Sequence, residues 1–182
     1  MSDKKYLYGF ANLGYIPVMV DEAGTYTAGS TYTAIPGAVS CSTNNNKEDF
    51  KIRADDGIWD SGAEWDDSSR TIVITEMELA LYASLTGSTF TNGVMEETTF
   101  DEAPAVALTF SALRADGGYR LFRYYCCKCT DVKVSHTTKG QSKDAQTYEL
   151  TFKVLPRKLD NGARGTKDVA AGDDLSWLRS VA

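Results

Sequence analysis

Apolar and polar residues alternate along much of the chain, most regularly in residues 147–155. There, Tyr148, Leu150, Phe152 and Val154 share one side of an extended segment, and the residues between them are polar or charged. A period of two places successive side chains on opposite faces of a strand. This segment is therefore predicted to be a strand with one face in a core and the other in solvent.

Similar patterns, rich in Val, Thr and aromatic residues, predict further strands. Residues 105–114 and 119–130 give the strongest signals, and the Ala-Asp-Gly-Gly sequence between them predicts a hairpin turn, because glycine tolerates positive φ. Shorter extended segments are expected at residues 6–10, 15–20, 31–42, 50–54 and 132–136.

Residues 70–82 are predicted to form a long strand of their own. On it, Glu76 and Glu78 are two residues apart and would share one face. A short helix is expected over residues 80–85 and is predicted to end at Gly87.

Two stretches lack the apolar positions that a packed domain needs. Residues 43–49 form a polar tract that predicts a mobile loop, and residues 43–69 together predict a long hairpin arm. This arm carries Trp59 and Trp65, and large aromatic residues on an exposed arm indicate a contact surface. Residues 157–182 predict a loose, glycine-containing tail with an apolar anchor at its end, docked on its own domain or on a neighbour.

The composition fits this pattern. The 182 residues are enough for one domain with a hydrophobic core, and the ten Tyr residues favour β-structure. We expect a mainly β fold, an antiparallel β-sandwich or barrel with one short flanking α-helix and a long hairpin arm, in a single domain over residues 1–182.

The charge excludes some classes of function. A formal net charge of -6 disfavours a grip on nucleic acid through counterion release, although it suits a conduit that must not hold its DNA. The first residues are charged and no apolar run follows them, so we expect no signal peptide; no stretch has the length of a membrane span, and no membrane association is expected.

Four cysteines raise the question of a metal site. Cys126, Cys127 and Cys129 are close in sequence, but zinc needs four converging ligands, and only Cys41 and His136 could complete the set. Strand alternation would place Cys126 on the face opposite to Cys127 and Cys129. Buried or free thiols are the preferred interpretation, and no metal or cofactor is predicted.

Few residues of the chain are candidates for a catalytic role. His136 is the only histidine, and no nucleophile motif accompanies it, so a surface or interface position is expected. Glu76 and Glu78 could form a pair of carboxylates for acid–base work, but nothing predicts a sugar cleft, and a solvent-facing or lumen-facing strip is preferred. No catalytic residue is therefore proposed.

Several short motifs occur in an order that resembles the major tail protein of siphophages, the tail tube protein family. Their order along nearly the whole chain carries the resemblance more than any one motif. Arg53 stands where that family has an aromatic residue, and Asp56 where it has Asn. The motifs are Tyr8-Gly9-Phe10-Ala11-Asn12-Leu13, Ile35-Pro36-Gly37-Ala38-Val39-Ser40, Ala54-Asp55-Asp56, Leu85-Thr86-Gly87, residues 105–110 and residues 119–122.

The resemblance implies a structural subunit of the virion tail. Such subunits join their sheets side by side into hexameric rings with a closed inner barrel, and the rings stack into a tube that conducts DNA. The implied partners are further copies of the chain, a tape-measure protein and a tail terminator, with assembly in the host cytoplasm. DNA would pass without specific binding.

The candidate site residues follow from this model. The expected subunit and ring-stacking contacts come from the arm (residues 43–69) and the tail (residues 157–182), and the candidates are Asn44, Asn45, Asn46, Trp59, Trp65 and Trp177. The candidates for the lumen are Glu76 and Glu78 or, alternatively, Asp131 and Lys133.

Three other functions remain open at this stage. A tail terminator, or a receptor- or carbohydrate-binding virion protein of related fold, would form single rings or monomers. A β-sandwich hydrolase would depend on Glu76 or Glu78 and would form no polymer. A secretion-system tube protein would share the architecture.

Overall fold

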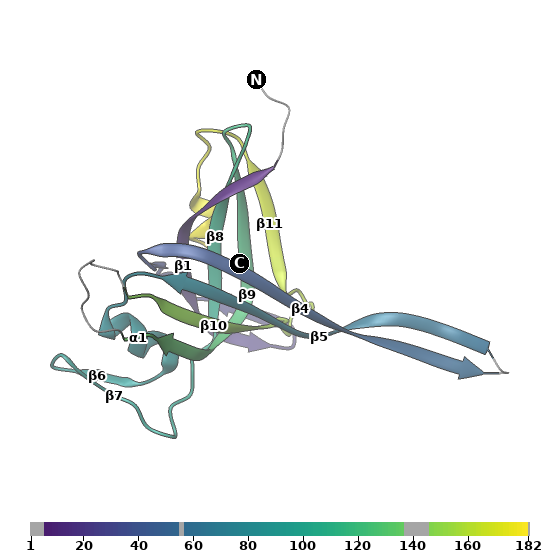
Figure 1. The fold of residues 1–182 in the computed structure, drawn as a ribbon, viewed down its shortest axis with the longest axis horizontal. Helices are drawn as coiled ribbons and strands as arrows, with labels where there is room; N and C mark the ends of the chain where they lie inside the picture. The colour runs from purple at the N-terminus through teal and green to yellow at the C-terminus, as the bar shows by residue number, and fades with distance from the viewer. Residues whose placement is uncertain (1–5, 55–56, 137–145, 182) are drawn as a thin grey trace.

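The computed structural model describes residues 6–54, 57–136 and 146–181 (Figure 1). Within these ranges the chain forms eleven strands, one α-helix and one 3-10 helix. Their bounds are β1 (Leu7–Glu22), β2 (Thr25–Ala28), β3 (Thr33–Ala34), β4 (Ala38–Ala54), β5 (Gly57–Ile74), α1 (Leu79–Thr86), β6 (Thr89–Thr91), β7 (Val94–Glu96), β8 (Val106–Arg114), β9 (Tyr119–Val134), β10 (Tyr148–Leu155), β11 (Arg164–Val169) and the 3-10 helix η1 (Ser176–Leu178). The prediction of a mainly antiparallel β fold with a short helix is confirmed.

The main sheet curls around its long central strand, β9. The strand order is β2-β1-β8-β9-β10-β5-β4, with β11 added beside β9 and β3 beside β1. The first half of β9 pairs with β8 and β11, and its second half pairs with β10. In Figure 1, β8 and β11 accordingly run upright, whereas β10, β5 and β4 run across the view.

The concave side of this sheet holds the main core. Leu150, Phe152 and Val154 of β10 are almost fully buried there, as the alternation in residues 147–155 predicts. Leu81 and Leu85 of α1 pack against the same cluster and close one side of it. The sheet thus needs only one short helix to cover its apolar face.

Two backbone hydrogen bonds join the ends of the curled sheet at one corner. The Ile35 amide donates to the Leu13 carbonyl at 2.9 Å, and the Thr75 amide donates to the Gly37 carbonyl at 2.9 Å. Gly37 has a φ of 69°, and a Cβ there would lie 2.7 Å from the Thr75 hydroxyl oxygen. Glycine is therefore required at this bend.

The prediction of a strand over residues 70–82 is wrong at its far end. β5 ends at Ile74, Glu76 lies in the following connection, and Glu78 is the N-cap of α1. The run of Leu and Ala from Leu79 has high helix propensity, which favours a helix over a continued strand. Glu76 and Glu78 therefore do not share the face of a strand.

The arm is a regular β-ribbon. Residues 43–49 are paired strand rather than the predicted loop, and the pairing of β4 with β5 continues out to Ala54 and Gly57. Figure 1 shows the ribbon leaving the body of the molecule. Pairing satisfies the inward-pointing backbone groups of both strands, and water can satisfy the outward-pointing ones, so polar side chains do not prevent the ribbon from forming.

The tail packs on its own domain and is not loose. β11 pairs with the first half of β9, and Leu178 of η1 joins Leu121 and Val169 in a second, smaller apolar cluster. The helical segments in the described ranges include none with the length and hydropathy to cross a bilayer.

Candidate functional site

The arm projects far beyond the core. Asn45 pairs with Ser68 at its base, and nine further residues of β4 continue outward. At about 3.3 Å per residue, the ribbon extends roughly 30 Å past this pair. Of the predicted contact residues, Asn44 and Asn45 lie at the base and are exposed. The backbones of Asn46, Trp59 and Trp65 lie in the ribbon, and their side chains are outside the described part of the structure.

A buried arginine fixes the base of the arm. Arg70 is 0% exposed, and its guanidinium donates to the Asn44 carbonyl at 3.4 Å and to Asn45 Oδ1 at 3.1 Å on β4. It also donates to the Ser68 hydroxyl at 2.9 Å and the Ser69 carbonyl at 2.6 Å on β5. Both strands of the arm are thus tied to one side chain, which limits the directions in which the arm can leave the body.

The sequence itself carries a signal for the buried position of Arg70. Ser68, Arg70, Ile72 and Ile74 occupy alternate positions of β5, and all four are buried. An arginine in phase with two core isoleucines indicates a buried guanidinium that needs several acceptors.

Around β10, the convex side of the sheet is mostly polar. Glu149, Thr151 and Lys153 alternate with the core residues of β10 and so point away from the core. The strand register places polar residues of three neighbouring strands beside them. This polar sheet face consists of Ser42, Asn44, Ser69, Thr71, Lys128, Asp131, Lys133, Glu149, Thr151 and Lys153.

The two predicted lumen pairs lie in different places. Lys133 Nζ is 3.3 Å from Glu149 Oε1 and 3.7 Å from Asp131 Oδ2, so Asp131 and Lys133 belong to the polar sheet face. Glu76 and Glu78 lie beyond the end of β5, next to α1. Only the alternative pair, Asp131 and Lys133, lies on an extended sheet surface.

Trp177 is partly covered by its own chain. The guanidinium carbon of Arg123 lies 4.0 Å from the centroid of the Trp177 ring, and Arg123 donates to the carbonyls of Trp177 and Ser180. These contacts hold η1 on β9. The ring therefore has a structural role in this chain, and its half-buried surface leaves limited area for another subunit.

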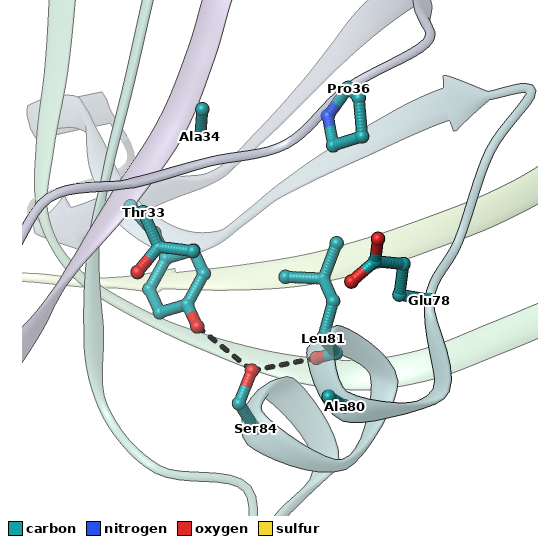
Figure 2. Close-up of a pocket in the computed structure, with 8 residues that line it drawn as sticks. Thr33, Ala34, Pro36, Glu78, Ala80, Leu81 and Ser84 are labelled. Carbon is teal, nitrogen blue, oxygen red and sulfur yellow. Dashed lines mark hydrogen bonds between the residues drawn. The ribbon is translucent and has the colours of Figure 1, made fainter. Parts of the chain in front are cut away.

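A pocket of about 520 Å³ lies beside α1 (Figure 2). Ala34 and Pro36 line one side of it, and Leu81 and Ser84 of the helix line the other. Glu78 is at its rim, whereas Glu76 does not line it. The pocket therefore brings together no pair of carboxylates of the kind that glycoside cleavage requires.

The thiols are free and buried or partly buried. Cys127 and Cys129 lie in the main core cluster and Cys126 does not, as strand alternation predicts. Burial raises the pKa of Cys41, Cys126 and Cys129 to about 11, and it raises that of Cys127 further. The thiols are therefore protonated at neutral pH and are poor nucleophiles.

The structure also bears on the candidate metal site and on His136. No group of three or more His, Cys, Asp or Glu side chains in the described ranges is arranged to hold a metal ion. His136 is exposed, as predicted, and one ring nitrogen lies 3.1 Å from Gln146 Oε1.

Two of the open strand edges in the described structure lie on β1 and β4. Residues 7–12 of β1 pair with β8 on one side and with no described strand on the other, and the edge is first covered at Leu13, whose carbonyl accepts from the Ile35 amide. β4 pairs only with β5 among the described strands. Open edges offer unpaired amides and carbonyls to a strand of another chain.

The sequence matches no protein-family model and no curated protein. Several solved structures are similar at low identity, including the following three. One is the tube terminating cap of the anti-feeding prophage, with 10% identity over 85% of this chain and 88% of that chain and a TM-score of 0.47. Another is the sheath-tube complex of an extracellular contractile injection system, PVC, with 12% identity, 88% and 90% coverage and a TM-score of 0.45. The third is the SPP1 tail tube, with 8% identity, 94% and 84% coverage and a TM-score of 0.44.

Proposed function

We propose that this chain is a structural subunit of a bacteriophage tail tube of the siphophage type. In this role, six copies join into a ring, rings stack into a tube around a tape-measure protein, and the tube conducts DNA to the host. A tail terminator closes the tube, and assembly takes place in the host cytoplasm. The subunit makes and breaks no covalent bond.

The arm is the observation that carries the proposal. It is a paired ribbon that extends about 30 Å past the core, and its two strands pair with each other. Ordering so many residues costs conformational entropy, which burial against the body of the same chain does not offset here. Contact with further copies would provide that burial.

The open edges support closure into a ring. Side-by-side pairing of sheets from neighbouring copies would use the free edges of β1 and β4 and so cover both of them. The polar sheet face would then line the lumen, with Asp131 and Lys133 among its charged residues. Glu76 and Glu78 are the weaker lumen candidates because they lie off the sheet.

Electron microscopy of the purified protein tests the proposal. Long hollow tubes or stacked rings are expected. Single rings alone would favour the tail terminator, and a monomer at every concentration would contradict both functions.

A variant with a shortened arm separates ring formation from stacking. Replacing residues 47–66 by Asn-Gly would join Asn46 to Asp67, which are paired in β4 and β5. This variant should form rings that do not stack. Long tubes from it would show that the arm is not a stacking element.

A further inference from the structure

A small groove lies between the two open strand edges. Its walls include Gly9 and Phe10 of β1 on one side and Cys41 and Thr43 of β4 on the other, and its volume is about 280 Å³. Aromatic residues of β8 and β9 form much of its floor, and Arg164 of β11 is at its rim. The floor residues are Phe110, Ala112, Phe122 and Tyr124.

Two cations at this groove lack a described counter-charge. Arg164 is exposed and forms no ion pair with a described residue. Arg70 lies behind the floor, with its guanidinium carbon 4.4 Å from the centroid of the Tyr124 ring. Its described acceptors are carbonyls, an amide and a hydroxyl, and its Nε has no partner among them. A buried cation without an opposite charge is costly, so a carboxylate at this groove would be stabilising.

The negative charge of the chain is concentrated in the arm. Residues 43–69 contain eight acidic and three basic residues, which account for five of the six net negative charges. The acidic residues are Glu48, Asp49, Asp55, Asp56, Asp60, Glu64, Asp66 and Asp67. The other 155 residues are therefore close to neutral, and the arm is the acidic segment that this chain can offer to Arg164 at the groove.

We propose that the groove of one copy receives the acidic arm of a second copy, within the assembly proposed above. The arm of the same copy leaves the body from the Asn45–Ser68 pair, and Figure 1 shows it extending outward rather than folding back over the body. Carboxylates of the incoming arm would face Arg164 at the rim of the groove. The arm and the groove are different surfaces of the chain, so the contact is heterologous and can repeat from one copy to the next.

Carbodiimide cross-linking of the full-length chain tests this contact. Arg164→Lys keeps the positive charge and introduces an amine that the reagent joins to a carboxylate in direct contact. Tubes assembled from a mixture of isotopically labelled and unlabelled chains should give a Lys-to-carboxylate link from position 164 to residues 43–69 of a different copy. Lys158 and Lys167, which are exposed and near in sequence, are the controls and should link to the arm much less.

Reversing the charge at position 164 tests the same contact through a second measurement, the protein concentration needed for assembly. Arg164→Glu should raise the protein concentration needed for assembly by about tenfold, and Lys158→Glu should change it little. Tubes that assemble normally from Arg164→Glu, or links from position 164 that reach only other segments, would overturn the groove contact and leave the proposed function intact. A wild-type chain that never self-associates would overturn both.

Discussion

Arg70 stacks on Tyr124, with its guanidinium carbon 4.4 Å from the ring centroid. Tyr124 is 2% exposed and belongs to the main core, and Arg70 is hydrogen-bonded to both strands of the arm. The contact therefore connects the base of the projecting ribbon to the centre of the curled sheet. A change at either residue should affect the arm and the core together.

Arg70→Met should lower the free energy of unfolding by about 2–4 kcal/mol. The variant keeps much of the side-chain volume but leaves the acceptors at the base of the arm without their donor. Arg164→Met is the matched control on an exposed arginine and should change stability by less than about 0.5 kcal/mol. Urea unfolding of both variants measures the difference, and equal effects would show that the buried hydrogen bonds contribute little.

Trp177→Ala should detach the tail from β9. The loss of the Arg123–Trp177 contact and of the apolar surface around η1 should cost about 1–3 kcal/mol. Hydrogen exchange should become faster in β11 and η1 while β10 stays protected. Leu159→Ala, at an exposed position in the same tail, is the control; unchanged exchange in β11 would contradict a docking role for Trp177.

Gly87→Ala should be more destabilising than Gly93→Ala. Both glycines have positive φ, but a Cβ at position 87 would lie 2.2 Å from the Glu102 carbonyl oxygen, whereas none of the described atoms lies within 4 Å at position 93. We expect a loss of about 1 kcal/mol at position 93 and about 2–4 kcal/mol at position 87. Thermal unfolding compares the two, and equal losses would show that the backbone at Glu102 moves freely.

The thiols should make the protein less stable at alkaline pH. Burial raises the pKa of Cys41, Cys126 and Cys129 from 9.0 to about 11, so the unfolded chain loses its thiol protons first. Between pH 9 and 11 the native state binds more protons than the unfolded state, and stability falls as pH rises, by up to about 1.4 kcal/mol per pH unit for each thiol. Unfolding measured over pH 8–11 checks this slope. Cys41→Ser should reduce the pH dependence of the unfolding free energy by the contribution of one thiol. An unchanged slope would be evidence that the buried thiols do not cause it.

Asp131→Asn combined with Glu149→Gln should leave tube assembly intact and change DNA release from phage particles. Both carboxylates contact Lys133 on the polar sheet face, which would line the lumen in the proposed tube. Asp174→Asn, in the tail, is the control. Loss of tubes in the double variant would instead identify these residues as subunit contacts.

Some features could have been predicted from local sequence and were missed. β6 and β7 form a hairpin around Asn92 and Gly93, both with positive φ, and Asn-Gly is a strong hairpin signal. β11 is different, because its sequence alternates weakly and contains Gly165. It is a strand because the first half of β9 has an open edge there, which depends on where β10 ends.

The sequence by itself determined the strands within residues 105–114, 119–130 and 147–155, the turn at residues 115–118, the short helix ended by Gly87 and the existence of an arm. These depend on side-chain periodicity and on glycine's backbone freedom, both of which are local. The tertiary structure alone decided where β5 ends, how the polar arm pairs, that the tail is docked, and that Arg164 and the free edges of β1 and β4 meet at one groove. Contacts between residues distant in sequence decide these features, because the energy of a buried charge or an open edge depends on what the rest of the chain places beside it.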